Sequence, residues 1–194
     1  MGQKTSKTKL MLIEVSRQLF AKNGKKNVTM NDIAESSNKG RRTLYTYFKS
    51  KDDVYKAVIN NELNRVLQRL TLVSMENGEP DTKLSNFILT HLDAIKEAVT
   101  RNGSLRSDFF MDIYEVERAR RPIDIKEVEF IRNILNEGVE KRIFKRMDVN
   151  LSAVIILYAI KGLEVPYIRQ NINSEFERHK DSIVEFVLTG IKRT

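Results

Sequence analysis

The chain has 194 residues, of which 41% are apolar and 31% charged, and its formal net charge is +8. This mixture is typical of a globular protein with one or two domains, and the absence of cysteine excludes a disulfide framework, a cysteine zinc site and a thiol nucleophile. Because a cysteine-free chain agrees with a reducing compartment and no apolar run approaches the roughly 20 residues of a membrane span, we expect a cytoplasmic protein.

Apolar residues recur at three- and four-residue spacing along the chain, and strict alternation is nearly absent. Together with only 8 Gly and 3 Pro, this pattern predicts an all-α protein of about nine helices. The first helix is expected to span Lys7 to Asn23 and to end at Gly24, because glycine readily adopts the left-handed conformation of a helix cap.

Two very short helices are predicted between Thr29 and Lys51. The hydroxyl of Thr29 can cap the first of them by accepting a bond from a backbone N–H. Asn38 lies where the chain must turn, and asparagine tolerates the left-handed backbone region. The second helix, from Arg41 to Phe48, has few core residues, so we expect it to be presented for contact with a partner.

Longer helices separated by breaks are predicted for the rest of the chain. They run from a cap at Ser50 to Met75, from Pro80 to a break at Asn102, from Ser104 to Arg118, from Asp124 to Arg142, from Leu151 to Gln170 with a kink or end at Pro166, and from Ser174 to Lys192. The break between Arg118 and Asp124 rests on Pro122, since proline removes a helical hydrogen bond.

The positive charge is concentrated in the N-terminal segment. Residues 1–53 carry 12 Lys/Arg and 5 Asp/Glu, a net of +7, whereas residues 54–194 carry 22 and 21, a net of +1. A basic surface alone serves solubility as often as nucleic-acid binding. Because this charge coincides with the two short helices, it predicts a surface that binds phosphates. The alternative is a small packed three-helix core with incidental basic residues.

The segment IAESSNKGRRTLYTYFKSKDDVY resembles the helix-turn-helix of the TetR family of transcriptional repressors, most specifically in the run T-L-Y-x-Y-F-x-S-K from Thr43 to Lys51. The resemblance is clear over about the first 55 residues. It implies a helix-turn-helix DNA-binding domain at residues 1–51, with three helices, and a helical-bundle domain for ligand binding and dimerisation at residues 52–194.

The resemblance, together with side-chain chemistry, implies which residues contact duplex DNA. Hydroxyl and ammonium groups that match the family's phosphate clamp fix the register without reading sequence. They are Thr29, Thr43, Tyr47 and Lys51. Side chains at positions that face base edges can read sequence. They are Arg41, Arg42, Tyr45 and Thr46, with Asn31 as a further candidate.

An effector pocket is expected among the middle helices. Their aromatic residues are core residues when taken singly, but together they resemble a family cavity that takes a small, largely apolar molecule. The candidate lining and anchoring residues are Phe87, His91, Phe109, Phe110, Tyr114, Phe130, Tyr158 and Lys161. For His91 two interpretations stay open: a core residue bonded to a neighbour, or a polar anchor for the effector. With only two histidines in the chain, no metal site or other cofactor is expected.

The last two predicted helices have more apolar surface than one core requires. One explanation is a single thick bundle. The preferred one is a twofold homodimer in which both helices pack against their mates, with Ile183, Phe186, Val187 and Ile191 in the interface.

These features together predict a dimeric, ligand-responsive repressor that binds a near-palindromic operator. A DNA-binding regulator without an effector is the alternative. An enzyme is not expected, because the chain has neither a glycine-rich phosphate loop nor a nucleophile elbow, and Glu115 and Glu117 diverge on their helix.

Overall fold

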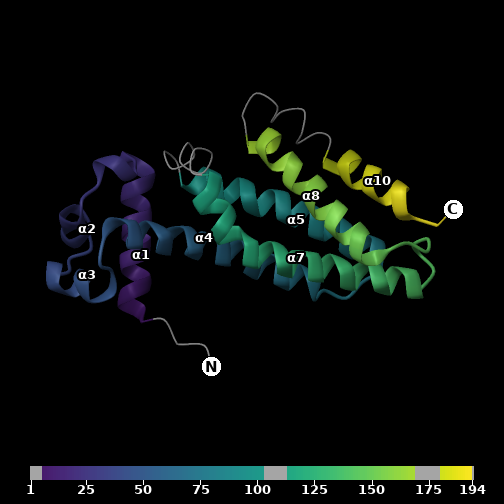
Figure 1. Ribbon diagram of the computed structural model, residues 1–194, viewed down its shortest axis with the longest axis horizontal. Helices are drawn as coiled ribbons and strands as arrows, with labels where there is room; N and C mark the ends of the chain where they lie inside the picture. Colours follow the sequence, from purple (N-terminus) through teal and green to yellow (C-terminus); the bar gives the residue numbers. More distant parts are fainter. Residues whose placement is uncertain (1–5, 103–112, 169–179, 194) are drawn as a thin grey trace. The chain divides into compact units, whose positions relative to one another are not determined.

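The computed structural model describes residues 6–102, 113–168 and 180–193; the side chains of 113–117, 165–168 and 180 are also left undescribed. These ranges are helical, as predicted, apart from short connections and one isolated antiparallel bridge between Phe144 and Lys192 (Figure 1). The helices are α1 (Lys7–Asn23), the short 3-10 helix η1 (Lys25–Asn27), α2 (Met30–Ser36), α3 (Arg41–Tyr47), α4 (Lys51–Ser74), α5 (Pro80–Arg101), α7 (Ile113–Glu140), α8 (Val149–Ile168) and α10 (Lys180–Ile191).

The chain divides into two compact units. The first comprises Met1–Asn64 and Ala98–Ala119, and the second comprises Arg65–Glu97 and Arg120–Thr194. Helices α4, α5 and α7 therefore each contribute residues to both units. The domain boundary expected after Lys51 falls at the start of α4 and stays a prediction.

The first unit contains a small core around α1. Leu12, Phe20, Ile33 and Leu44 are completely buried and come from α1, α2 and α3. The bounds of α1 agree with the prediction, and Gly24 ends it with φ of 78°, a value that glycine adopts without the steric penalty of a side chain.

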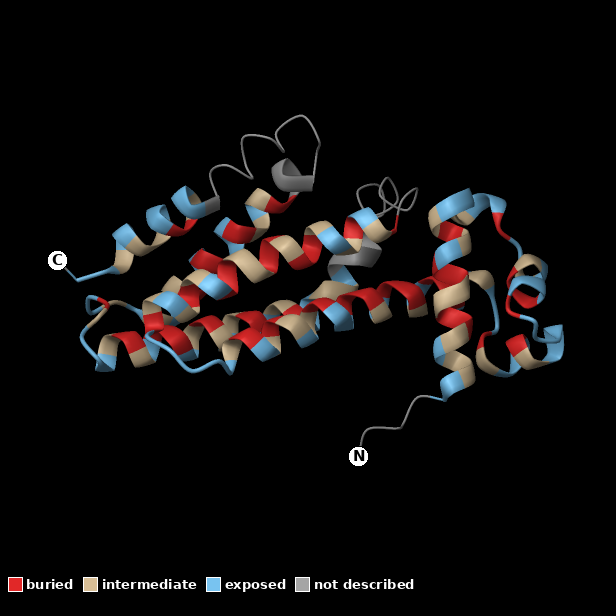
Figure 2. Cartoon of the chain, turned by 180° about the vertical axis from the view of Figure 1, so that it is seen from behind, coloured by how far each residue is buried: buried red, intermediate tan, exposed pale blue. Residues whose placement is uncertain are grey.

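The second unit has its core between α5, α7 and α8, and α10 lies next to α8 (Figures 1 and 2). Buried residues line the inner faces of these helices while exposed residues cover the outer faces (Figure 2). The completely buried apolar residues of the unit are Leu70, Leu84, Phe87, Ile88, Leu92, Ile131, Leu135 and Ala153.

The predicted break at Pro122 is wrong, because α7 is continuous from Ile113 to Glu140 with Pro122 inside it. Proline costs a helix one backbone hydrogen bond, but neighbouring contacts hold this segment helical. Ile123 is buried directly after it, and Arg120 is bonded to Glu164 on α8. The break between two helices that we expected here is therefore replaced by one long helix.

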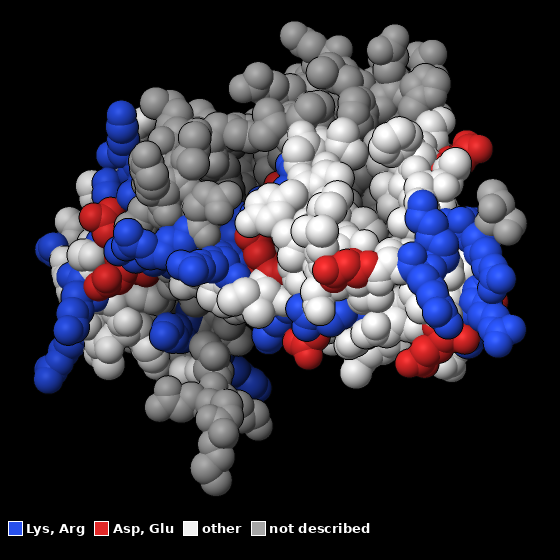
Figure 3. All heavy atoms as spheres, turned by 45° about the vertical axis from the view of Figure 1, so that its right-hand side comes forward, with Lys and Arg blue, Asp and Glu red and all other residues white. Residues whose placement is uncertain are grey.

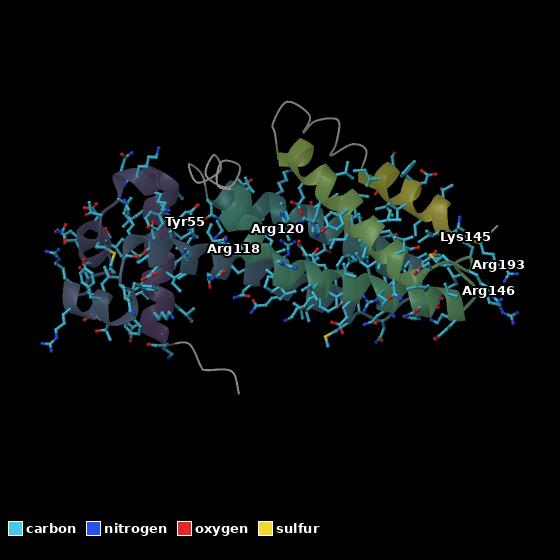
Figure 4. The ribbon with its side chains drawn as sticks, in the orientation of Figure 1. Tyr55, Arg118, Arg120, Lys145, Arg146 and Arg193 are labelled. Carbon is cyan, nitrogen blue, oxygen red and sulfur yellow. The ribbon has the colours of Figure 1, made fainter. Side chains whose placement is uncertain are left out.

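The end of α7 is joined to the end of α10 by backbone contacts. The N–H of Lys145 donates to Ile191 O at 2.9 Å, and the N–H of Arg193 donates to Ile143 O at 3.0 Å. The intervening Phe144 is buried against Gly138. Lys145, Arg146 and Arg193 lie at this same end of the second unit (Figure 4).

Candidate functional site

Helix α2 begins with a reciprocal cap between Thr29 and Asp32. The hydroxyl of Thr29 accepts from the N–H of Asp32 at 3.2 Å, and the carboxylate of Asp32 accepts from the N–H of Thr29 at 2.8 Å. These bonds hold the pKa of Asp32 below its usual range. The predicted capping role of Thr29 is thus confirmed, and the cap fixes the start of a helix of only seven residues.

The turn between α2 and α3 is made at Asn38. Its φ is 51°, in the left-handed region that asparagine tolerates, as predicted. Its N–H donates to Glu35 O, and the N–H of Lys39 donates to Ala34 O. These bonds reverse the chain so that α3 starts at Arg41, with Gly40 in the cap position.

Helix α3 presents polar side chains outward. Leu44 is completely buried and Phe48 is nearly so, and they fix the helix to the first unit. Four residues predicted to face base edges are exposed: Arg41, Arg42, Tyr45 and Thr46. The hydroxyl of Thr46 donates to Arg42 O at 2.9 Å, which leaves its oxygen free to accept. Asn31 on α2 is also exposed.

The predicted phosphate-binding residues are spread over the ends of the same helices. Tyr47 Oη lies 3.2 Å from the hydroxyl of Ser6, which precedes α1, and Thr43 is half-buried in the first turn of α3. The ammonium of Lys51 donates to Lys25 O at 2.9 Å. An ammonium has three donors, so Lys51 can stabilise the end of η1 and still bind a phosphate.

A second polar site surrounds His91 in the core of the second unit. His91 on α5 is completely buried between two carboxylates: Nε2 lies 2.8 Å from Glu164 Oε1 on α8, and Nδ1 lies 3.0 Å from Glu127 Oε2 on α7. Both glutamates are buried as well. Buried charges persist only when they are paired, so this arrangement is a three-helix ionic contact.

The ionic contact continues through Arg120, which Figure 4 labels on α7. Its two terminal nitrogens each donate to Glu164 at 2.6 Å, a bidentate geometry that fixes both side chains. Asp124 lies one turn further along and accepts from Lys161 at 2.6 Å. We call His91, Arg120, Asp124, Glu127, Lys161 and Glu164 the buried ionic cluster.

The charges in this cluster shift one another's protonation. Burial disfavours the imidazolium, but pairing with Glu127 and Glu164 prevails and raises the pKa of His91 to about 9. Burial likewise disfavours the carboxylate of Glu164, but its bonds from Arg120 and His91 lower its pKa to about 2. At neutral pH the cluster therefore contains the imidazolium of His91 and the carboxylate of Glu164.

The predicted effector residues are distributed unevenly. Phe87 is completely buried, with its ring edge-on to that of Phe130 at 6.3 Å, and His91 and Lys161 belong to the buried ionic cluster. Tyr158 is 62% exposed and lies on the surface of α8, where the ammonium of Lys161 is 5.5 Å from its ring. Phe109 and Phe110 lie outside the described residues, as does the side chain of Tyr114. The pocket itself stays a prediction.

An exposed apolar stripe runs along α8. Leu151, Ile155 and Tyr158 are each more than half exposed and recur at helical spacing. On α10, Phe186 is 83% exposed, while the other predicted interface residues Ile183, Val187 and Ile191 are half-buried. On the face drawn in Figure 3, a wide area of uncharged surface is interrupted by a few acidic side chains and has Lys and Arg side chains at its edges.

Four members of the buried ionic cluster were not singled out from the sequence: Arg120, Asp124, Glu127 and Glu164. One signal was available. Glu164 is an acidic residue in the most apolar helix of the chain, and a charge in such a helix requires a partner. Among the described residues, no three His or acidic side chains are placed to hold a metal ion, and none of the helices has a stretch apolar and long enough to span a bilayer.

Comparisons with known proteins found a family match for the N-terminal helices and relatives over nearly the whole chain. Residues 12–58 match the family of bacterial regulatory proteins of the tetR type. Over 185 residues the chain is 21% identical to a fatty acid metabolism regulator protein of Bacillus subtilis, covering 94% of both chains.

Solved structures share the fold over nearly the whole chain. A transcriptional regulator from Cytophaga hutchinsonii superposes with a TM-score of 0.78 at 21% identity, covering 95% of this chain and 98% of that one. The regulator FadR from Bacillus subtilis, solved in complex with stearoyl-CoA, superposes with a TM-score of 0.65 at 18% identity, covering 94% and 98%.

Proposed function

Because the chain belongs to the TetR family of bacterial regulatory proteins, we propose that it is a repressor that binds a near-palindromic operator as a homodimer and responds to a small, largely apolar effector. The observation that carries the DNA-binding part is the orientation of α3. Leu44 is buried while Arg41, Arg42 and Tyr45 face solvent, so the helix is anchored by one face and offers guanidinium and phenol groups on the other. Arg can bond guanine through two donors at once in the major groove.

The roles of the remaining candidates follow from where they lie. Thr29, Thr43 and Lys51 lie at the beginnings of α2, α3 and α4, and Tyr47 ends α3, so their hydroxyl and ammonium groups can bind phosphates. We assign this activity to the bacterial cytoplasm, where the duplex is found.

The homodimer is supported by the exposed stripe of α8 together with Phe186 of α10. Contiguous apolar surface of this kind usually marks an interface. A dimer would also place two α3 helices on one duplex, about 34–36 Å apart or a multiple of that spacing, which is the geometry that a palindromic site requires.

For the effector we propose an acyl-bearing molecule as the first class to test. Among the relatives, one is named for fatty acid metabolism and one was solved with stearoyl-CoA. Phe87 and Phe130, whose rings contact each other edge-on, lie about one helical turn from His91 and Glu127, and we assign them to the apolar part of this site. The regulator without an effector is the second candidate, and one observation favours it: the ring of His91 already has partners on both nitrogens within the chain.

A selection from random duplexes tests the DNA-binding proposal. The chain should enrich a near-palindromic sequence, and its affinity should fall with salt with a log–log slope of about −0.9 per neutralised phosphate. Absence of duplex binding at low salt would overturn the proposal.

Dimerisation and effector binding are tested separately. Sedimentation should give a dimer for the unaltered chain and a monomer for Val187→Asp. A monomer in both cases would overturn the proposed homodimer. A stearoyl-CoA titration should raise the melting temperature and change operator affinity, since coupling between two sites is reciprocal. If a wider acyl-CoA and free fatty acid series leaves both quantities unchanged, the acyl-bearing class is excluded.

A further inference from the structure

A second cluster of charged side chains lies inside the first unit. Arg101, the last residue of α5, donates to Glu14 of α1 at 2.8 Å and lies 3.5 Å from Glu62 of α4. Arg17 of α1 binds the same Glu14 through several bonds, the shortest 2.8 Å, and Asn102 donates to Glu62 at 3.1 Å. We call these five residues the α5 end cluster, and it joins three helices.

Arg17 also binds the backbone at the C-terminal end of α5. The guanidinium of Arg17 donates to Arg101 O at 2.7 Å. The last carbonyls of a helix have no partner within the helix and carry partial negative charge, so a cation there stabilises the helix end. Arg17 of α1 therefore serves as the C-terminal cap of α5.

Burial makes the cluster sensitive to displacement. Arg17, Glu62 and Asn102 are buried, and Asn102 is completely so. Separating a buried ion pair costs much more free energy than separating an exposed one. A displacement of α5 along or about its axis would break these bonds unless α1 moved with it.

The same helix carries His91. Ten residues separate His91 from Arg101, about 15 Å along a continuous α-helix at 1.5 Å per residue. The middle of α5 is thus tied by ion pairs to α7 and α8, and its C-terminal end is tied by an ion pair to α1. Coupling between sites is carried by rigid elements joined through such contacts.

We propose that the α5 end cluster transmits regulation to the DNA-binding helices, with Arg17 and Arg101 as positioning residues that make α1 follow α5. This inference rests on the proposed function, because it concerns how the state of the second unit changes operator affinity. Since α1 packs directly against α2, a shift of α1 repositions the helix-turn-helix.

Hydrogen exchange with and without a selected operator duplex tests the link, because coupling acts in both directions. Amides of residues 84–97 of α5 should exchange more slowly when the duplex is bound to the unaltered chain. We expect a slowing of at least about fivefold there and below about twofold in Arg101→Gln, since coupling factors run from about 5 to 150. Protection of α2 and α3 by the duplex should persist in the variant.

Two further variants separate a transmitting role from a structural one. Arg101→Lys keeps a cation beside Glu14 and should restore the response, whereas Arg69→Gln removes an exposed α4–α5 ion pair of the second unit and should leave it intact. If Arg101→Gln fails to fold, Glu14→Gln replaces it, with the same expected loss.

The outcomes are distinguishable. An α5 response that is equal in Arg101→Gln and the unaltered chain overturns the inference, as does a duplex-bound chain without any α5 response. If no duplex is selected at all, the proposed function fails and the inference falls with it.

Discussion

Arginine is used in two opposite ways in this protein. On α3, Arg41 and Arg42 extend into solvent from a helix that is held by Leu44 and by Phe48 directly after it. On α7, Arg120 makes two bonds of 2.6 Å to a buried carboxylate and lies within the core of the second unit. The guanidinium group is available to a partner on α3 and engaged within the chain on α7. We therefore expect substitutions on α3 to change binding without changing stability, and substitutions in the buried ionic cluster to do the reverse.

The largest expected effect is that of Glu164→Ala. The change leaves Arg120 and His91 without their shared carboxylate, and an uncompensated buried charge costs about 3–5 kcal/mol. Urea denaturation should give this loss in the free energy of unfolding. Glu97→Ala is the control, since Glu97 pairs with Arg69 on the surface and such pairs contribute about 0–1 kcal/mol. Equal losses of unfolding free energy in Glu164→Ala and Glu97→Ala would contradict the distinction between buried and exposed ion pairs.

Close packing in the second unit should give the next largest effect. A Cβ at Gly138 would lie 2.0 Å from the ring of Phe144, so Gly138→Ala must displace a buried aromatic residue. Overpacking of this kind costs about 1–3 kcal/mol. Gly162→Ala on α8 meets no atom within 4 Å and should stabilise the chain by about 0.5–1 kcal/mol through its helix propensity. Thermal denaturation of the two variants should shift the midpoint in opposite directions.

The buried ionic cluster should also give the second unit a characteristic pH dependence. Because the pKa of His91 is raised from 6.5 to about 9, its pairing stabilises fully below pH 6.5 and is lost as pH rises through 9. Because the pKa of Glu164 is lowered from 4.5 to about 2, its contribution is present above pH 4.5 and is lost as pH falls towards 2. Stability from these two groups is therefore greatest between pH 4.5 and 6.5. In urea titrations across the alkaline range, His91→Gln should lack the decrease near pH 9, and a decrease retained in that variant would assign it to another group.

The smallest effect on stability is expected for Arg41→Ala. An exposed substitution away from packing changes the free energy of unfolding by within about 0.5 kcal/mol. Loss of a bidentate contact to a base nonetheless costs about 1–3 kcal/mol of discrimination at that base pair. Selection from random duplexes should show relaxed preference at one position in each half-site. Lys51→Ala should instead weaken binding to all sequences alike. If Lys51→Ala also relaxed the base preference at one position, the assignment of Arg41 to a base and of Lys51 to a phosphate would be contradicted.

Local features of the fold were predictable from sequence, because each depends on residues close together in the chain. The bounds of α1, the cap at Thr29 and the left-handed Asn38 follow from propensities and short-range hydrogen bonds. The predicted break at Pro122 was wrong because the rule that proline interrupts a helix also considers only neighbouring residues. The contact between Arg120 and Glu164, 44 residues apart, supports the helix there, and no local pattern contains it.

The buried ionic cluster shows the same limit in the candidate sites. Two interpretations of His91 stayed open from the sequence; the structure buries it in the core, and its partners lie on other helices, 36 and 73 residues away in sequence. No pattern within α5 itself contains these two carboxylates. The exposed residues of α3 were easier, because Tyr45 and Thr46 lie within the nine-residue motif from Thr43 to Lys51, and Arg41 and Arg42 directly precede it.

If Thr29 binds a phosphate in the proposed operator complex, its reciprocal cap has a consequence for the kinetics of binding. Its oxygen uses one lone pair to accept from Asp32, so the hydroxyl proton remains available to a phosphate. The cap therefore holds the rotamer of this side chain before a duplex binds, so less conformational entropy is lost when the contact forms. A group prepared in this way favours rapid capture on encounter, so the effect of replacing Thr29 should be seen in the association rate as well as in the lifetime of the complex.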